Sequence, residues 1–128
     1  MRLATFRHRT SGPRFGIVRG DRIVDVVAAA EALHRPVPAA TVKAALTTGP
    51  QTLAALGDLA ADAERKGLLH PLAEVKFLPP ISDPSKFFCV GKNTRKHREE
   101  LVANKMLTEM PNEPTGFIKL VSTMSGDG

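Results

Sequence analysis

The chain has 128 residues, of which 42% are hydrophobic and 24% charged, and its net charge is +5. This length suffices for a domain with a hydrophobic core, and no apolar run approaches the roughly 20 residues that span a bilayer. The opening residues MRLATFRHRT carry charge throughout and lack the apolar core of a signal peptide. We therefore expect a cytoplasmic protein without a membrane partner.

The single cysteine, Cys89, excludes an intrachain disulfide, in keeping with a cytoplasmic setting. Its neighbours in FFCVG are apolar, which predicts a buried side chain rather than a reactive thiol.

The excess of positive charge suits nucleic acid or a small anion, or has no functional meaning. No block of five uninterrupted basic residues occurs, and among Phe, Tyr and Trp only the six Phe are present for stacking on bases. We therefore expect no nucleic-acid partner, and steeply salt-dependent binding would be needed to support one.

Three short apolar segments at the start of the chain predict strands. They cover residues 3–8, 15–18 and 22–27, and the turn-rich segments RTSGPR (9–14) and RGD (19–21) separate them. This pattern predicts a three-stranded antiparallel meander.

Helix-favouring segments follow at 26–34, 39–47 and 50–66. The third has Pro50 in its first turn and Gly67 just after its last. Its apolar residues recur at helical spacing. They are Leu53, Leu56, Ala60 and Ala63, with Leu59 beside them.

A proline-rich connector at 79–85 follows an extended segment that includes Val75 and Phe77. It predicts a boundary between a small α/β domain at 1–78 and a second unit at 86–128. The expected fold class is therefore α+β.

The second unit contains predicted strands at 86–90 and 116–121, a charged helix at 94–104 and a proline-marked loop at 108–114. Two strands and one helix are too few for an independent domain. We therefore expect this part of the protein to be truncated here or to be completed by something else.

His97 and Glu100 are three residues apart and share one face of the predicted helix. A carboxylate beside an imidazole orients it as a general base that can activate water. His-x-x-Glu also arises by chance, and the alternative is a plain surface helix in which Glu99 pairs with Arg95 and Glu100 with Lys96.

Four cations lie at the start of this helix, where the helix dipole disfavours them by about 0.3–1 kcal/mol each. They are Lys92, Arg95, Lys96 and Arg98. Neither Asn93 nor Thr94 is followed by the Glu or Gln of a capping box. This crowding without evident compensation is typical of a functional, anion-binding site.

The stretch DPSKFFCVGKNTRKHREE (83–100) resembles the signature of the fumarylacetoacetate hydrolase family, a strand followed by Gly-x-Asn-Tyr and His-x-x-Glu. The stretch PTGFIK (114–119) is similar to the family's Pro-x-x-Phe-x-Lys strand. The opening MRLATFR…GIVRGDRIVDV resembles the small N-terminal domain of bacterial members. The resemblance implies that residues 86–128 are the first elements of the family's catalytic domain, a mixed β-sandwich or roll.

The resemblance also implies an activity, namely metal-assisted hydrolysis, decarboxylation or isomerisation of a small anionic oxo-acid at a carbon–carbon bond beside a carbonyl. His97 and Glu100 would activate water on a lid helix that orders over the substrate. Lys119, together with Lys92 and Asn93 of the turn, would bind the substrate. The implied cofactor is Mg²⁺, or Mn²⁺ or Ca²⁺ in its place, the setting is aromatic-compound catabolism, and the full-length protein is expected to be a homodimer.

The sequence departs from the family pattern at three points. Thr94 replaces the usual Tyr, Leu120 follows Lys119 where Pro is common, and the Glu-x-Glu metal ligands are absent. We therefore expect the isolated chain to hold no metal site and to be inactive, with residues 92–110 mobile in the absence of ligand. The alternative is a non-catalytic binding or assembly module whose sheet is completed by a partner chain.

Overall fold

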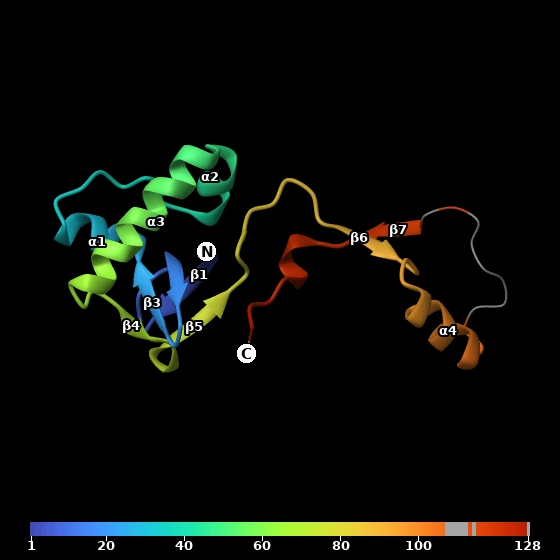
Figure 1. Ribbon diagram of the computed structural model, residues 1–128. Helices are drawn as coiled ribbons and strands as arrows, with labels where there is room; N and C mark the ends of the chain where they lie inside the picture. Colours follow the sequence, from blue (N-terminus) through green and yellow to red (C-terminus); the bar gives the residue numbers. More distant parts are fainter. Residues whose placement is uncertain (107–112, 114, 128) are drawn as a thin grey trace. The chain divides into compact units, whose positions relative to one another are not determined.

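The computed structural model describes residues 1–106, 113 and 115–127, and they form a mixed α+β structure (Figure 1). The chain divides into two compact units. The N-terminal unit comprises Met1–Ser82 with the tail from Ser125, and the C-terminal unit comprises Asp83–Met124. The division falls inside the proline-rich segment 79–85, whereas the sequence had placed the whole tail in the second unit.

The N-terminal unit is built on a five-stranded sheet with the order β4-β3-β2-β1-β5. The predicted three-stranded meander is confirmed as β1, β2 and β3, and every strand pair in the described part of this sheet is antiparallel. The strands are β1 (Arg2–His8), β2 (Arg14–Arg19), β3 (Arg22–Asp25), β4 (His70–Pro71) and β5 (Val75–Leu78).

The three predicted helices are confirmed as α1 (Val26–Ala32), α2 (Val42–Thr47) and α3 (Pro50–Arg65). The side chains of Asp25 and Thr41 accept hydrogen bonds from the first turns of α1 and α2. Because of these caps, β3 ends before residue 27 and α2 begins after residue 39. The helix propensity of the two segments did not predict these boundaries.

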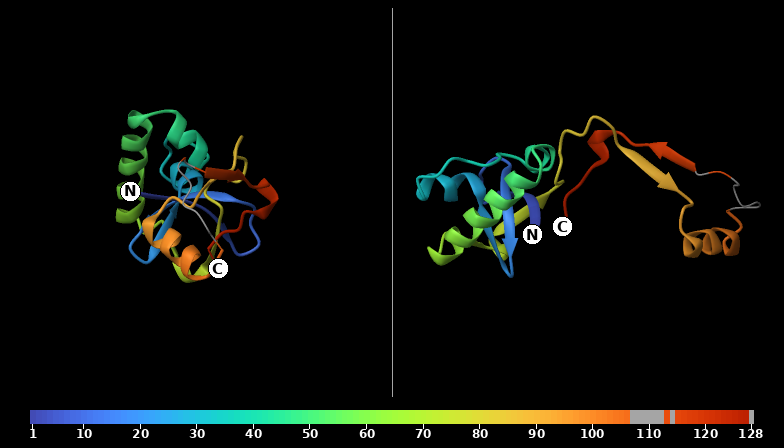
Figure 2. Two further views of the ribbon diagram at one scale, coloured as in Figure 1. Left: turned by 90° about the vertical axis from the view of Figure 1, so that its right-hand side faces the viewer. Right: turned by 45° about the horizontal axis from the view of Figure 1, so that its top comes forward.

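Helices α1, α2 and α3 cover one face of the sheet (Figures 1 and 2). The predicted apolar stripe of α3 packs there, and its Leu56 is fully buried. Because side chains alternate across a strand, Phe15 and Ile17 of β2 face the helices. The buried residues of this layer are Phe15, Ile17, Val24, Val26, Ala29, Ala30, Ala39, Val42, Ala45, Leu56, Leu59, Ala60 and Ala63.

The other face of the sheet is also apolar, and the sheet curls to cover it. Phe6 and Ile23 are fully buried on this face. Gly16 lies between them, and a Cβ there would come within 2.7 Å of both side chains. The short 3-10 helix η1 (Leu72–Glu74) and strand β5 add partly buried apolar residues, which are Leu72, Val75 and Phe77.

A buried carboxylate joins the sheet to the first helix. Asp25, only 6% exposed, accepts from Arg14 Nε at 2.6 Å and from the Ala28 backbone N–H at 3.1 Å. The hydrogen bond to Asp25 raises the pKa of Arg14. Because each carboxylate oxygen of Asp25 accepts a hydrogen bond, its burial does not leave an unpaired charge in the core.

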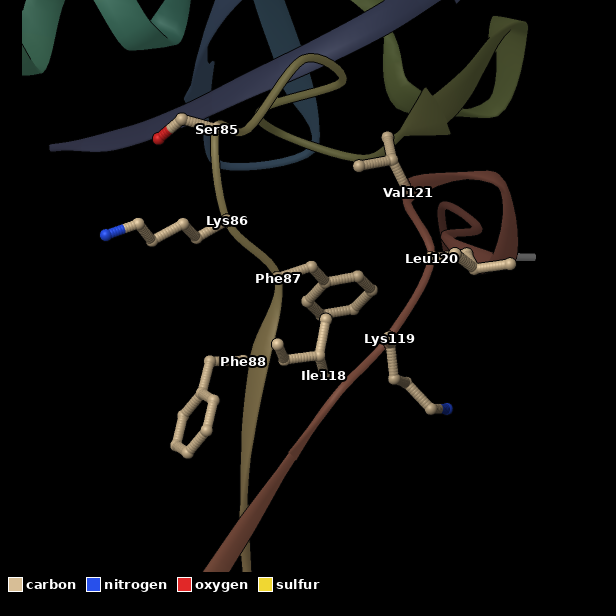
Figure 3. Close-up of a pocket in the computed structure, with 8 residues that line it drawn as sticks. All are labelled: Ser85, Lys86, Phe87, Phe88, Ile118, Lys119, Leu120 and Val121. Carbon is tan, nitrogen blue, oxygen red and sulfur yellow. The ribbon is translucent and has the colours of Figure 1, made fainter.

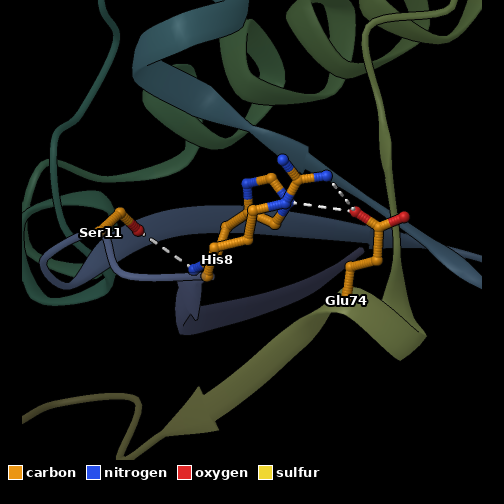
Figure 4. Close-up of polar contacts among 4 residues, drawn as sticks. His8, Ser11 and Glu74 are labelled. Atoms are coloured by element: carbon orange, nitrogen blue, oxygen red, sulfur yellow. Dashed lines mark hydrogen bonds and ion pairs between the residues drawn. The ribbon is translucent and has the colours of Figure 1, made fainter.

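Two histidines meet where β4 and η1 lead across to β5. The rings of His8 and His70 stack with their centroids 4.2 Å apart. His8 Nε2 lies 3.3 Å from Glu74 Oε2, and Arg9 lies 3.5 Å from the same oxygen (Figure 4). Burial and the neighbouring His8 lower the pKa of His70, while Asp25 and Glu74 act in the opposite direction. The hydrogen bond from His8 lowers the pKa of Glu74.

The C-terminal unit consists of β6 (Phe88–Gly91), α4 (Arg95–Ala103), β7 (Thr115–Ile118) and the 3-10 helix η2 (Val121–Thr123). Strands β6 and β7, here called the ribbon, pair antiparallel with Phe88 opposite Ile118. The predicted loop at 108–114 lies outside the described residues, apart from Glu113. No helix in the described part of the chain is long and apolar enough to cross a membrane.

The expectation of a buried strand at KFFCV was wrong. Phe88 is 61% exposed, Val90 is also exposed, and Cys89 is only partly buried. An isolated pair of strands has no second layer to pack against, so apolar side chains on an open face stay in contact with solvent.

The lowered pKa of His70 predicts that the stability of the N-terminal unit depends on pH. The folded state favours the neutral imidazole, so the unfolded state binds more protons once the pH falls towards the ordinary value of 6.5. The contribution of His70 to stability is therefore fully present above that value and is lost as the pH is lowered below it. Urea unfolding at several pH values measures it.

His70→Gln should flatten this pH dependence between about pH 7.5 and 5.5, a window in which carboxylates stay ionised. The matched control is His34→Asn, because His34 is an exposed histidine in the connection after α1. If His70→Gln keeps the full pH dependence of the wild type, the assignment to His70 is wrong.

Candidate functional site

The turn between β6 and α4 is shaped by an unusual backbone conformation at Lys92. Its φ is 52°, in the left-handed region that costs a non-glycine residue about 1–2 kcal/mol. Arg98, on the first turns of α4, donates from Nε to the Lys92 carbonyl oxygen at 2.6 Å. This bond reaches from the helix back to the turn and holds the strained residue in place.

Two of the four cations at the start of α4, Arg95 and Arg98, have partners. Arg95 Nε donates to Glu99 Oε1 at 2.9 Å, as the surface-helix alternative predicted, and Arg98 bonds the turn. The N-cap residue Thr94 makes no side-chain capping bond. The crowding inferred from the sequence is therefore partly compensated by one ion pair and one hydrogen bond to the backbone.

His97 and Glu100 lie together on the exposed surface of α4. His97 Nδ1 is 3.6 Å from Glu100 Oε2, an ion-pair distance that is slightly longer than a hydrogen bond. Both side chains are more than half exposed. The pairing of Glu100 with Lys96, expected for a plain surface helix, is replaced by this contact with His97.

A pocket of about 370 Å³ lies between α4 and the ribbon, and we call it the turn pocket. It brings together two of the predicted site residues, Lys92 and His97, with the apolar walls supplied by Leu101 and Phe117. Its lining residues are Gly91, Lys92, His97, Leu101, Thr115, Gly116 and Phe117. A cation, an imidazole and an apolar wall suit a small anion that carries an apolar group.

Lys119 lines a different pocket of about 330 Å³, which we call the strand pocket. Its backbone N–H donates to the Phe87 carbonyl oxygen at 2.9 Å, which extends the pairing of the ribbon beyond β7. Figure 3 shows the side chains of Lys86 and Lys119 extending to opposite sides of this pocket. The pocket is lined by Ser85, Lys86, Phe87, Phe88, Ile118, Lys119, Leu120 and Val121.

The predicted site residues are thus not all brought together. Lys92 and His97 share the turn pocket, Glu100 is joined to it through His97, and Lys119 lies in the strand pocket. Asn93 is exposed, beside Lys92 in the turn, and does not line the turn pocket among its described residues.

Sequence reasoning missed Arg98 and the apolar wall. Arg98 had been counted only as an unfavourable charge, because nothing in the sequence shows that Lys92 adopts a left-handed conformation and needs a donor. The helical spacing of His97 and Leu101, i and i+4, was a signal that both face the same side of α4.

The described residues contain no group of three or more His, Cys, Asp or Glu side chains that could hold a metal ion. At the turn pocket, the donors present are His97 and Glu100. Mg²⁺ prefers oxygen ligands, and of this pair the Glu100 carboxylate is the one that supplies them.

A comparison with protein-family models finds no family that matches this chain. A comparison with curated proteins finds no match either.

The two glycines of the ribbon differ in how closely other atoms approach them. A Cβ at Gly116 would overlap the ring of Phe88 and come within 2.9 Å of the Cys89 carbonyl oxygen. A Cβ at Gly91 would meet Thr115 Oγ1 at 3.4 Å, an ordinary contact. Phe88 therefore lies over the backbone of Gly116, and this contact requires a residue without a side chain.

We predict that Gly116→Ala destabilises the ribbon by about 1–3 kcal/mol, because the Phe88 ring must leave its position. Gly91→Ala is the matched control in the partner strand and should change stability by no more than about 0.5 kcal/mol. Amide hydrogen exchange at residues 88–91 and 115–118 measures both. Adding Phe88→Ala to Gly116→Ala should remove much of the loss, and equal protection in the two glycine variants would contradict the close contact.

Proposed function

We propose that this chain is part of an enzyme of the fumarylacetoacetate hydrolase type that cleaves or rearranges a carbon–carbon bond next to a carbonyl in a small oxo-acid. The motif pair at 83–100 and 114–119 supports this proposal, and the C-terminal unit would then belong to a mixed β-sandwich or roll. The cytoplasmic location and the homodimer remain predictions of the same resemblance.

One observation carries the proposal: the His97–Glu100 pair lies at the turn pocket with Lys92. Glu100 lies 3.6 Å from His97 Nδ1, from where its carboxylate would orient the imidazole and leave Nε2 to accept a proton from water. Lys92 supplies a positive charge for the carboxylate of the substrate. Leu101 and Phe117 would exclude water from the apolar part of the same molecule.

For the divalent cation implied by the resemblance, the described residues offer no group of three or more His, Cys, Asp or Glu side chains, and the His97–Glu100 pair supplies one imidazole and one carboxylate. Under the proposal its ligands come from outside the described residues. The chemistry that the residues of this chain would supply is proton transfer by His97 and binding of the substrate carboxylate by Lys92.

In the enzyme that combines this chain with a metal-binding domain, His97→Ala and Glu100→Gln should each lower kcat for an oxo-acid by about 10²–10⁴-fold, since each removes the general base or its orienting group. Glu99→Gln is the matched control, because Glu99 lies on the same helix but pairs with Arg95. Turnover is measured with a panel of small oxo-acids. Near-wild-type turnover by His97→Ala would rule out the assigned base.

A second candidate function is an assembly module that a β-rich partner chain completes. The exposure of the ribbon favours it, since Ile118 is 80% exposed and Phe88 opposite it is 61% exposed. Apolar side chains gathered on one open strand pair are typical of a surface that another layer or strand covers.

If the assembly function is correct, the chain purified from its native source should carry a β-rich partner, and the amides of residues 116–121 should be protected only in that complex. Mass measurement in solution and hydrogen exchange test this. A folded monomer with protected amides at 116–121 would contradict it, whereas oxo-acid turnover that depends on His97 would favour the first function.

A further inference from the structure

We propose that Arg98 is the positioning residue of the turn pocket: by holding Lys92 in the left-handed conformation, it directs Lys92 and His97 into the same cavity. The inference rests on the proposed function for the role of the pocket, and on the structure alone for the role of Arg98. Arg98 would thereby have a structural role at a position where the helix dipole disfavours a cation.

The first observation is geometric. The Arg98 guanidinium reaches six residues back along the chain to the Lys92 carbonyl oxygen, with 2.6 Å between Nε and the oxygen. A short hydrogen bond from a charged donor is among the stronger kinds in proteins. Lys92 has a φ of 52°, a conformation that a lysine adopts only where its surroundings impose it.

The second observation is burial. Arg98 and Lys92 are both partly buried, whereas Asn93, Thr94, Arg95 and Lys96 between them are exposed. The contact therefore lies on the inner side of the turn, where water competes less for the carbonyl oxygen.

The third observation is the phase of the helix. His97 immediately precedes Arg98, and successive side chains on an α-helix point about 100° apart. When Arg98 is bonded to the Lys92 carbonyl, the rotation of the first turn of α4 is set, and with it the direction of His97. One contact thus fixes both residues of the pocket, Lys92 through its backbone and His97 through the helix.

Arg98→Met tests this, because methionine keeps an unbranched side chain but cannot donate. In the 128-residue chain, NMR should show Lys92 losing its positive φ and the resonances of His97 and Phe117, which both line the turn pocket, shifting. Lys96→Met is the matched control, since it removes one charge from an exposed neighbour on the same helix. The positive φ of Lys92 should survive in that variant.

Two further variants separate positioning from general damage to the fold. Arg98→Lys retains a donor and should restore the positive φ of Lys92 at least in part. Lys92→Gly added to Arg98→Met should restore the turn without the donor, because glycine adopts this φ without strain. If Lys92 keeps its conformation in Arg98→Met, or if neither rescue works, the proposal is overturned.

Activity separates this inference from the proposed function. In the complete enzyme, Arg98→Met should lower kcat/KM by about 10²-fold through misplacement of Lys92 and His97, and Arg98→Lys should recover most of it. If His97→Ala leaves turnover unchanged, the proposed function is wrong. The role of Arg98 is then judged by NMR alone, from whether Lys92 loses its positive φ in Arg98→Met.

If His97 is essential for turnover but Arg98→Met and Lys96→Met have equal kcat/KM, the positioning role of Arg98 is overturned.

Discussion

Phe6 lies on the face of the N-terminal sheet that the helices leave uncovered, and it is nevertheless fully buried. The sheet is apolar on both faces, so both must be removed from water. Helices α1, α2 and α3 cover one face of the sheet. The sheet curls over its own second face, where Gly16 leaves room for Phe6 and Ile23, and the segment from β4 to β5 covers the rest of that face. The stack of His8 on His70 and the contact of His8 with Glu74 lie on that crossing.

The C-terminal unit does not remove its apolar side chains from water in this way. Its ribbon leaves large apolar side chains exposed, and no residue of α4 is buried. Local polar contacts take the place of burial, chiefly the bond from Arg98 to the Lys92 carbonyl and the ion pair of Arg95 with Glu99. A pocket held by a few such contacts depends strongly on each of them.

Much of the fold could be predicted because its signals are local. The meander followed from short apolar segments separated by turn formers, and α3 from the spacing of Leu56, Ala60 and Ala63 between Pro50 and Gly67. Strand ends were less predictable: Asp25 stops β3 because its side chain caps α1. Of the site, the nearness of His97 to Glu100 follows from the i, i+3 spacing, whereas the separation of Lys119 into another pocket depends on where β7 ends.

The sequence by itself determined the meander of β1, β2 and β3, the helices α1 to α4, where the connector lies, and that His97 and Glu100 share a helix face, whereas β4 and the 3-10 helices were not predicted. These properties depend on residues a few positions apart, whose relative geometry the backbone dictates. The tertiary structure alone decided that both sheet faces are buried, that Phe88 and Cys89 are not deeply buried, and that Arg98 bonds the Lys92 carbonyl. Burial and turn conformation depend on which other segments pack against a given segment, and the residues of that segment alone do not specify those contacts.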